Sequence, residues 1–435
     1  MTNLGLNLAG RGKTPFGRVA LTFLAGFLGC GSNVDEFPFP DAGPQPDAPP
    51  LVEGGVDAED PEEPDAPPSA CPVVSPIRLT TALGDSSQPA ILWNGAQYVV
   101  VWADGRAGVG MGDIYGAILS AEGAVVAPER VLVDTPNLAT SPEIAIQPAP
   151  LQGYALVYED CMGSTELGCT QGAVGSVNLG PDLTPTGAPQ MLTGPAPVQR
   201  RPYLAAGHGN VYVTYRDQIP AAVGSPAKTV ARLAPLAPTG ALLNEGVLID
   251  QASDGHYPHV AVGPTQVALA YQRNKPTPEI VLALFDPMLT LLKELPVRTG
   301  LPQEATNPVV QWNTSRWVLA WEDERDGLAV IYASVAAADG SSADPPQKAY
   351  PENGNWPAIA SGGKNTSLIG FYGFPGERVF LARMQENGQL KPGQVVIGVG
   401  KFPSVAYNPA ADEYGVAYQD DKEDEIMFAR FKCAD

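Results

Sequence analysis

The sequence repeats one pattern seven times after residue 76, and this repetition constrains the fold more than any other feature. Residues 307–335, NPVVQWNTSRWVLAWEDERDGLAVIYASV, show the pattern most clearly. A proline-led apolar run is followed by a polar turn, a second apolar run ending at Trp321, a charged turn and a third apolar run. The leading proline recurs at intervals of 46 to 60 residues. These anchor prolines are Pro89, Pro142, Pro202, Pro258, Pro308, Pro357 and Pro403.

Each repeat has the composition of four short strands. Runs of four to eight residues rich in Val, Ile, Tyr and Trp, separated by Gly, Asn, Asp and Pro, are strand and turn signals. The second run of each repeat ends in an aromatic: Trp102, Tyr158, Tyr215, Tyr271, Trp321, Phe371 with Tyr372, and Tyr418. Third strands are expected at 114–119, 173–177, 230–233, 280–285, 330–335, 379–384 and 426–431. Six repeats add a fourth stretch, clearest at 130–133, 247–249 and 395–397 and weakest near 347–350.

Four short strands in each unit of about 50 residues predict an all-β fold, a seven-bladed β-propeller with four antiparallel strands per blade. The ends of the repeat array predict how the ring closes. The seventh repeat stops after its third strand, near Phe431, and an extra strand-like run at 76–80 precedes the first repeat. We expect residues 76–80 to serve as the fourth strand of the last blade, because a closed ring leaves few exposed sheet edges.

The first 70 residues have the composition of export and display segments. Arg11, Lys13 and Arg18 precede an apolar run at 19–29, which is too short to cross about 30 Å of hydrocarbon and is typical of a signal-peptide core. Residues 31–70 contain 10 prolines and 11 acidic residues but no Lys or Arg. Such a segment cannot offset its ordering entropy, so we expect a disordered, extended stalk. The expected domains are a signal peptide (1–29), Cys30 with the stalk (30–70) and the propeller (71–435).

Four cysteines within the propeller region agree with this closure. Pairing of 76–80 with 426–431 would bring Cys71 near Cys433, while Cys161 and Cys169 lie in one loop after Tyr158. Four cysteines allow three connectivities, and the other two would require distant blades to meet. Export favours oxidation, so we predict the disulfides Cys71–Cys433 and Cys161–Cys169. In the chain-entropy model, closing the long loop between Cys71 and Cys433 would raise the free energy of unfolding by about 4–5 kcal/mol.

In a propeller, the links between second and third strands lie on the same rim as the links between blades. That rim collects the residues before the anchor prolines: Gln88, Ser141, Arg201, Tyr257, Asn307, Trp356 and Phe402. It also collects the motif Trp-x-Asp-x-Arg at 102–106 and 321–325. A site needs one constellation, so we interpret this repeated motif as structural, with each Asp bonding its own turn.

The candidate ligand contacts are aromatic and basic residues expected around the central opening: Tyr257, Trp356, Phe402, Arg200 and Arg201. Aromatic faces at a channel mouth suit sugars or peptide side chains, and the alternative is that these residues only plug the ring. His256 and His259 could supply two ligands to a zinc ion, which usually requires three or four. The acidic run at 420–425 lacks the residue spacing of a calcium-binding loop. We therefore expect no metal and no cofactor.

The motif search favours binding over catalysis. Gly-x-Ser-x-Gly, His-Glu-x-x-His, Walker and Rossmann fingerprints are absent from the sequence. A net charge of −21 argues against nucleic acid as a partner. The leading hypothesis is a binding or scaffolding propeller; a polysaccharide-acting hydrolase or lyase is the alternative, and a structural role in an envelope assembly is a third. Two carboxyl groups converging on the pore about 5–10 Å apart would favour the enzyme.

The segment Phe27-Leu28-Gly29-Cys30 resembles the lipobox of bacterial lipoproteins. With the acidic stalk and the degenerate repeats, the chain resembles bacterial envelope lipoproteins that carry a propeller on a proline-rich stalk. The resemblance implies cleavage before Cys30, lipidation of that cysteine and, from Gly31, export to the outer membrane, facing the periplasm or the exterior. An ordinary secretory signal is the alternative. Such lipoproteins usually have no assigned activity, and the lipid anchor makes the membrane a partner. From the residues of the rim we expect a carbohydrate, a peptide or an envelope protein as the ligand.

Overall fold

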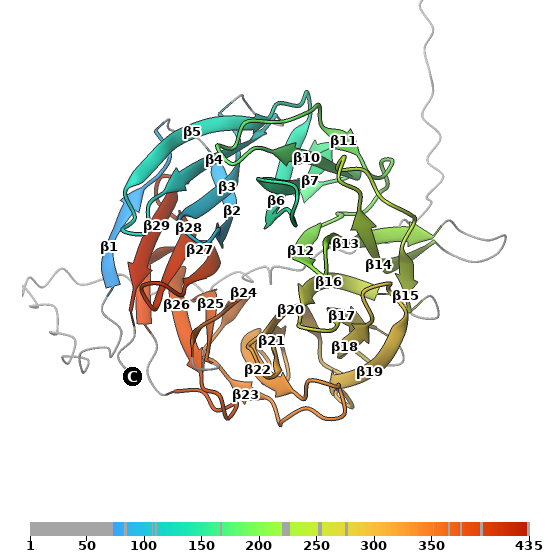
Figure 1. Cartoon of the computed structure of the whole chain (residues 1–435). Helices are drawn as coiled ribbons and strands as arrows, with labels where there is room; N and C mark the ends of the chain where they lie inside the picture. Colours follow the sequence, from blue (N-terminus) through green and yellow to red (C-terminus); the bar gives the residue numbers. More distant parts are fainter. Residues whose placement is uncertain are drawn as a thin grey trace, which may run out of the picture. The chain divides into compact units, whose positions relative to one another are not determined.

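The computed structural model describes residues 73–432, except 82–84, 107, 109–110, 166–167, 220–226, 251–254, 275–276, 351, 364–365, 375 and 392–394. Within these ranges the chain forms seven units of four antiparallel strands around a central axis (Figure 1). The predicted all-β, seven-bladed propeller is confirmed. Within the same ranges, no helix has the length and hydrophobicity needed to cross a membrane.

Strands are given for each blade from the channel outward. Blade 1 contains β2 (Ser86–Trp93), β3 (Tyr98–Asp104), β4 (Asp113–Leu119) and β5 (Val125–Val133). Blade 2 contains β6 (Leu138–Ile146), β7 (Tyr154–Cys161), β10 (Gly172–Leu179) and β11 (Gln190–Met191), with a hairpin of β8 (Ser164–Thr165) and β9 (Gly168–Cys169). Blade 3 contains β12 (Tyr203–Gly207), β13 (Asn210–Ile219), β14 (Lys228–Leu236) and β15 (Val247–Ile249).

The remaining blades follow the same order. Blade 4 contains β16 (Gly255–Val262), β17 (Val267–Arg273), β18 (Glu279–Phe285) and β19 (Leu291–Arg298). Blade 5 contains β20 (Ala305–Trp312), β21 (Trp317–Asp323), β22 (Val330–Ala336) and β23 (Gln347–Lys348). Blades 6 and 7 contain β24 (Gly354–Ser361), β25 (Ser367–Gly373), β26 (Arg378–Met384), β27 (Val395–Asn408), β28 (Glu413–Asp420), β29 (Ile426–Phe431) and β1 (Val73–Arg78).

Blades 6 and 7 share one long strand where the sequence predicts two. The first part of β27 pairs with β26 up to Val399, and from Gly400 onward it pairs with β28. The chain therefore passes from the outer edge of blade 6 to the centre of blade 7 without a turn. A side chain would not fit at the crossing, because a Cβ on Gly400 would lie 2.3 Å from the carbonyl oxygen of Gln419.

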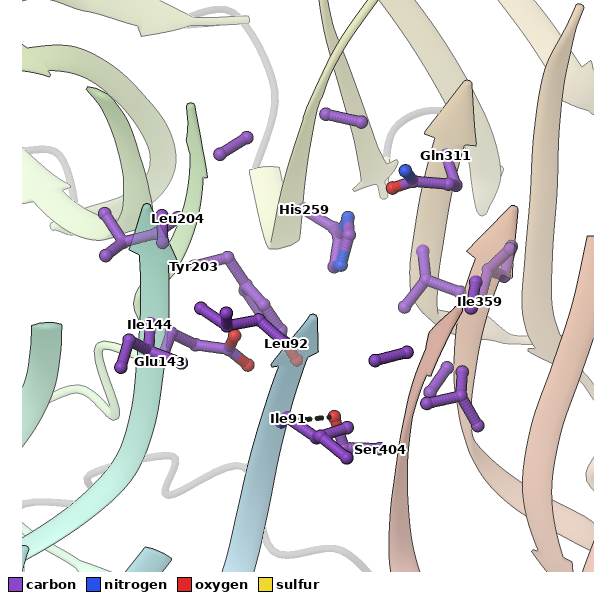
Figure 2. Close-up of a pocket in the computed structure, with 18 of the residues that line it drawn as sticks. Ile91, Leu92, Glu143, Ile144, Tyr203, Leu204, His259, Gln311, Ile359 and Ser404 are labelled. Carbon is purple, nitrogen blue, oxygen red and sulfur yellow. Dashed lines mark hydrogen bonds between the residues drawn. The ribbon is translucent and has the colours of Figure 1, made fainter. Parts of the chain in front are cut away.

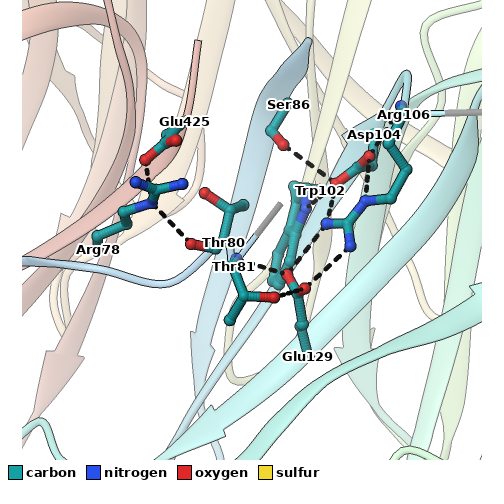
Figure 3. Close-up of polar contacts among 9 residues, drawn as sticks. All are labelled: Arg78, Thr80, Thr81, Ser86, Trp102, Asp104, Arg106, Glu129 and Glu425. Carbon is teal, nitrogen blue, oxygen red and sulfur yellow. Dashed lines mark hydrogen bonds and ion pairs between the residues drawn. The ribbon is translucent and has the colours of Figure 1, made fainter. Parts of the chain in front are cut away.

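The predicted closure of the ring by an N-terminal strand is confirmed, with shifted bounds. Strand β1 begins at Val73 rather than residue 76 and pairs antiparallel with β29, Val73 opposite Phe431 and Arg78 opposite Met427. The guanidinium group of Arg78 forms an ion pair with Glu425 in the turn before β29 (Figure 3). Cys71 and Cys433 lie outside the described residues, so their disulfide stays a prediction.

Hydrophobic clusters hold neighbouring blades together. The described residues form seven such clusters, one at each interface between blades. The aromatics that end the second strands lie in these clusters; Trp102 and Trp321, for example, are fully buried. Since burial of apolar surface is the main stabilising contribution to folding, the repeated aromatic explains why each blade requires its neighbour.

The Trp-x-Asp-x-Arg motif closes the turn after the second strand, in agreement with its structural interpretation. The indole nitrogen of Trp102 donates to Oδ2 of Asp104 at 3.2 Å, and the guanidinium group of Arg106 lies 2.6 Å from the same oxygen (Figure 3). Burial alone would raise the pKa of Asp104, but the bonds from Arg106 and Trp102 outweigh it and leave the pKa below its ordinary value. Blade 5 repeats the arrangement with Trp321, Asp323 and Arg325.

Candidate functional site in the central channel

A cavity of about 690 Å³ runs along the central axis and is lined by the innermost strands of all seven blades. Its volume lies within the range of pockets that bind small molecules. Of the described residues that line it, Glu143 is the single acidic one and Arg201 the single arginine or lysine. The remaining described lining is apolar, aromatic or neutral polar.

The residue before each anchor proline has a left-handed backbone conformation, with φ between 42° and 53°. We call these seven residues the mouth ring: Gln88, Ser141, Arg201, Tyr257, Asn307, Trp356 and Phe402. In six of the seven innermost strands, the ladder pairing shifts at the same place. A bulge redirects the side chains that follow it, and left-handed non-glycine residues persist only where surrounding contacts enforce them. The backbone conformation of each mouth-ring residue therefore orients its side chain in every blade.

Four of the five predicted ligand contacts come together in the mouth ring. The guanidinium carbon of Arg201 lies 4.9 Å from the ring centroid of Tyr257 and 4.6 Å from that of Trp356. Trp356 in turn packs edge-to-face on Phe402, with ring centroids 5.1 Å apart. Arg201 also donates a hydrogen bond to Oδ1 of Asn307 at 3.1 Å. Residues of blades 3, 4, 5, 6 and 7 therefore form one continuous group.

Arg200, the fifth predicted contact, does not join this group. Its side chain is 4% exposed and donates to the carbonyl oxygen of Gly172 at 3.1 Å and to Oδ1 of Asp217 at 2.7 Å. It joins blades 2 and 3 and has a structural role in this arrangement.

Two buried glutamates, Glu322 of blade 5 and Glu159 of blade 2, bond to the mouth ring and to the residue beside it. Glu322 accepts hydrogen bonds from the backbone nitrogen of Trp356 at 2.7 Å and from the side chain of Asn307 at 2.9 Å. Glu159 accepts from the backbone nitrogen of Arg200 at 2.6 Å. Burial raises the pKa of both carboxyl groups, although these hydrogen bonds and the charge of Arg201 act in the opposite direction.

We call the residues that follow the anchor prolines the inner ring; all of them except Ala90 line the channel: Ala90, Glu143, Tyr203, His259, Val309, Ala358 and Ser404. Three of its polar members, Glu143, Tyr203 and His259, come from the adjacent blades 2, 3 and 4, and their side chains project into the channel (Figure 2). The rings of Tyr203 and His259 lie 4.7 Å apart, centroid to centroid. Sequence reasoning missed Glu143 and Tyr203, although their position relative to the repeated proline is a signal that it had available.

His259 is neutral and its tautomer follows from one hydrogen bond. Its Nδ1 accepts from the backbone nitrogen of Val310 at 3.3 Å, so Nε2 carries the proton. Burial lowers the pKa of His259 to about 4, which keeps the imidazole uncharged near neutral pH. His256 lies instead beside Arg216, with Nδ1 and a guanidinium nitrogen 3.1 Å apart.

Glu143 is half-buried in the channel wall and differs from the buried carboxylates. Within the described ranges, neither of its carboxyl oxygens accepts a hydrogen bond and no cation forms an ion pair with it. Its depth in the channel removes most of the surrounding water, and this desolvation raises the pKa of Glu143 to about 8. Burial raises the pKa of Tyr203 above its usual range, and the charge of Glu143 adds to the effect.

No three potential metal ligands converge in the described part of the channel. Among the described residues, one group of three such side chains lies within 4.8 Å: Glu159, Cys161 and Cys169. Cys161 and Cys169 form the predicted disulfide, which is confirmed, and Glu159 is engaged by Arg200. In the acidic run, Asp420 accepts hydrogen bonds from backbone nitrogens of its own turn.

Comparisons with known proteins identify similar folds but no family. Neither a protein-family model nor a curated protein sequence matches this chain. The Trypanosoma rangeli sialidase matches with a TM-score of 0.42 and 12% identity, over 84% of this chain and 60% of the sialidase. Polysaccharide lyase Uly1 matches with a TM-score of 0.49 and 11% identity, over 82% of this chain and 91% of the lyase.

The subtype N10 neuraminidase-like protein of A/little yellow-shouldered bat/Guatemala matches with a TM-score of 0.43 and 10% identity, over 83% of this chain and 99% of that protein. This chain therefore spans about three-fifths of the length of the Trypanosoma rangeli sialidase. At these identities the likeness concerns the β-propeller fold and carries no information about chemistry.

Proposed function

We propose that this protein is an exported binding module that takes up a small ligand in its central channel. The supporting observation is the combination of a ligand-sized cavity with charged and aromatic groups that converge on it from separate blades. Arg201 makes one side-chain hydrogen bond in the described structure, to Asn307, and its other guanidinium donors remain available to a ligand. A group with spare donors at the entrance of a pocket favours recognition.

The enzymatic alternative, a polysaccharide-acting hydrolase or lyase, has less support. Glycoside hydrolysis commonly uses two carboxyl groups about 5–10 Å apart. Glu143 is the single acidic residue among the described residues of the lining, while Asp104 and Asp323 are engaged in their own turns. The arrangement therefore favours binding over catalysis.

Filling the channel tests the proposed site. The change Ala358→Trp places an indole among the lining residues of blade 6, while Val126→Trp on the exposed outer strand β5 is the control. Thermal denaturation of the full chain is measured with oligosaccharides, peptidoglycan fragments and peptides. A ligand at 100 times its Kd stabilises the native state by about 2.7 kcal/mol. We expect Ala358→Trp to abolish the shift that the control retains, and equal shifts in both variants would place the ligand elsewhere.

We also propose that Cys30 is lipidated, that residues 31–70 are the stalk, and that the propeller is displayed from the outer membrane. The support is the lipobox-like segment before Cys30 and the acidic, proline-rich composition after it. We expect Cys30→Ser to move the protein from the membrane fraction to the soluble fraction, because the acyl chains supply the membrane affinity. Fractionation of cells expressing either form checks this. Membrane association of Cys30→Ser would favour another mode of attachment.

A further inference from the structure

Among the described residues, the half-buried carboxyl group of Glu143 has no hydrogen-bond or ion-pair partner, whereas the buried acids Glu159, Glu322 and Asp323 are engaged. Glu159 and Glu322 each accept backbone hydrogen bonds, and Asp323 is paired with arginines. A carboxylate that is partly withdrawn from water is costly unless it is paired, so the unpartnered carboxyl group of Glu143 calls for an explanation. Because Glu143 projects into the channel, its partner can come from a ligand (Figure 2).

We propose that the inner ring binds a primary ammonium group, with Glu143 as its counter-ion and the rings of Tyr203 and His259 beside it. This inference rests on the proposed function and names the class of ligand for the same channel. The ammonium group belongs to a lysine side chain or to an amino sugar, because both carry a primary amine.

The polar groups around Glu143 suit a cation. The imidazole of His259 is uncharged, and the face of a tyrosine ring attracts cations. Gln311 and Ser404 also line the channel and contribute further oxygen atoms (Figure 2). An ammonium group has three donors and no acceptor, so it needs one anion and a few neutral oxygens, which this set provides.

The charges elsewhere agree with this assignment. Arg201, the single arginine or lysine among the described lining residues, forms no ion pair with Glu143 and is held between Tyr257 and Trp356. A metal ion is less suited to the inner ring, because no three potential metal ligands converge in the described part of the channel. The net charge of −21 attracts cations to the protein at long range.

Binding of an ammonium group requires ionised Glu143, so its affinity depends on pH. The described titratable or charged groups that line the channel with Glu143 are Tyr203 on β12, His259 on β16, Tyr407 on β27 and Arg201 of the mouth ring. The pKa of His259 is lowered to about 4 and that of Tyr203 is raised above its usual range, so neither changes charge between pH 6 and 9. Glu143, with a pKa of about 8, is mostly protonated at pH 7 and releases its proton on binding.

Isothermal titration calorimetry of the full chain tests the proposal with two matched pairs of probes. The first is Nα-acetyl-lysine amide against its Nε-acetylated form, and the second is glucosamine against N-acetylglucosamine. Each pair differs in the ammonium charge, and the two pairs distinguish a peptide from a sugar source. We expect at least tenfold tighter binding of the charged member of one pair. For the lysine amide, affinity should rise about tenfold from pH 6 to 7 and level off above pH 8.

The variant Glu143→Gln should weaken binding of the charged probe at least tenfold, whereas Glu122→Gln on an exposed turn should leave it unchanged. A raised carboxyl pKa means that ionisation of Glu143 destabilises the native state as pH rises from about 4.5 to 8. Gln cannot ionise, so the Tm of Glu143→Gln at pH 8 should equal or exceed that of the wild type. If the Tm is retained, a loss of binding in Glu143→Gln cannot be attributed to unfolding of the variant.

Three outcomes overturn the ammonium site: equal binding of the acetylated probes, full affinity in Glu143→Gln, or constant affinity from pH 6 to 8. If uncharged compounds bind and Ala358→Trp blocks them, the channel is the site and only the ammonium assignment fails. If no compound binds, or if Ala358→Trp has no effect on binding, the proposed function fails as well.

Discussion

Replacing Asp323 by Asn is expected to lower the free energy of unfolding by about 3–5 kcal/mol, because it leaves buried guanidinium charge unpaired. Asp323 is fully buried and accepts hydrogen bonds from the indole nitrogen of Trp321 at 2.9 Å and from Nε of Arg298 at 3.2 Å. Arg325 pairs with the same carboxylate. Arg298 is itself 2% exposed, so water cannot replace the lost charge.

The effect of this change should depend on pH in a defined direction. Burial alone would raise the pKa of Asp323, but the bonds from Arg325, Trp321 and Arg298 hold it below its ordinary value. A lowered carboxyl pKa stabilises the native state above the unfolded-state pKa of about 4, and this stability is lost as pH falls through the lower folded-state value. The difference between wild type and Asp323→Asn should therefore narrow in acid.

Urea unfolding at pH 7 and at pH 3 measures both effects. The matched control is Asp339→Asn in an exposed turn of the same blade, where a surface substitution should change stability by no more than about 0.5 kcal/mol. Equal destabilisation by the two changes would show that the buried charge pairing contributes little.

The change Cys71→Ser is expected to lower the free energy of unfolding by up to about 5 kcal/mol, because a Cys71–Cys433 disulfide would restrict nearly the whole repeat array in the unfolded state. The register between β1 and β29 supports the pairing: Val73 lies opposite Phe431 and Val74 opposite Arg430. In the sequence, Cys71 precedes Val73 by two residues and Cys433 follows Phe431 by two residues.

The second disulfide provides the matched control. Cys161 and Cys169 are eight residues apart, so removing their bond with Cys161→Ser and Cys169→Ser should cost only about 2.5 kcal/mol on the same account. Thermal unfolding with and without reducing agent compares the variants, and peptide mass mapping identifies the bonded pairs. Free thiols at both Cys71 and Cys433 would disprove the first disulfide and leave closure to the strand pairing alone.

The neighbouring residues Arg200 and Arg201 show how far sequence reasoning extends. Both are basic and precede an anchor proline, so the pattern assigned them the same ligand-binding role. In the structure Arg201 has a φ of 42° and joins the mouth ring, while the guanidinium group of Arg200 bonds Gly172 and Asp217. The difference depends on contacts with residues 17 to 155 positions away in the chain, which leave no local signal.

Glu143, Tyr203 and His259 illustrate the same limit at the inner ring. Each follows a recognisable proline, yet their convergence depends on the bulges in β6 and β16 and on the placement of blades 2, 3 and 4 around one axis. Strand β27, which crosses from blade 6 to blade 7, is a further example. The sequence predicts two separate strands there, whereas in the structure they form one continuous strand.

The sequence by itself determined the strand pattern, the seven blades, the closing strand and the Cys161–Cys169 bond, because period-two hydrophobicity, turn residues and repeat spacing act over short distances along the chain. Tertiary structure alone decided which polar residues converge in the channel. That convergence arises from long-range packing between blades, from bulges that redirect side chains and from desolvation, which depends on every neighbouring blade at once.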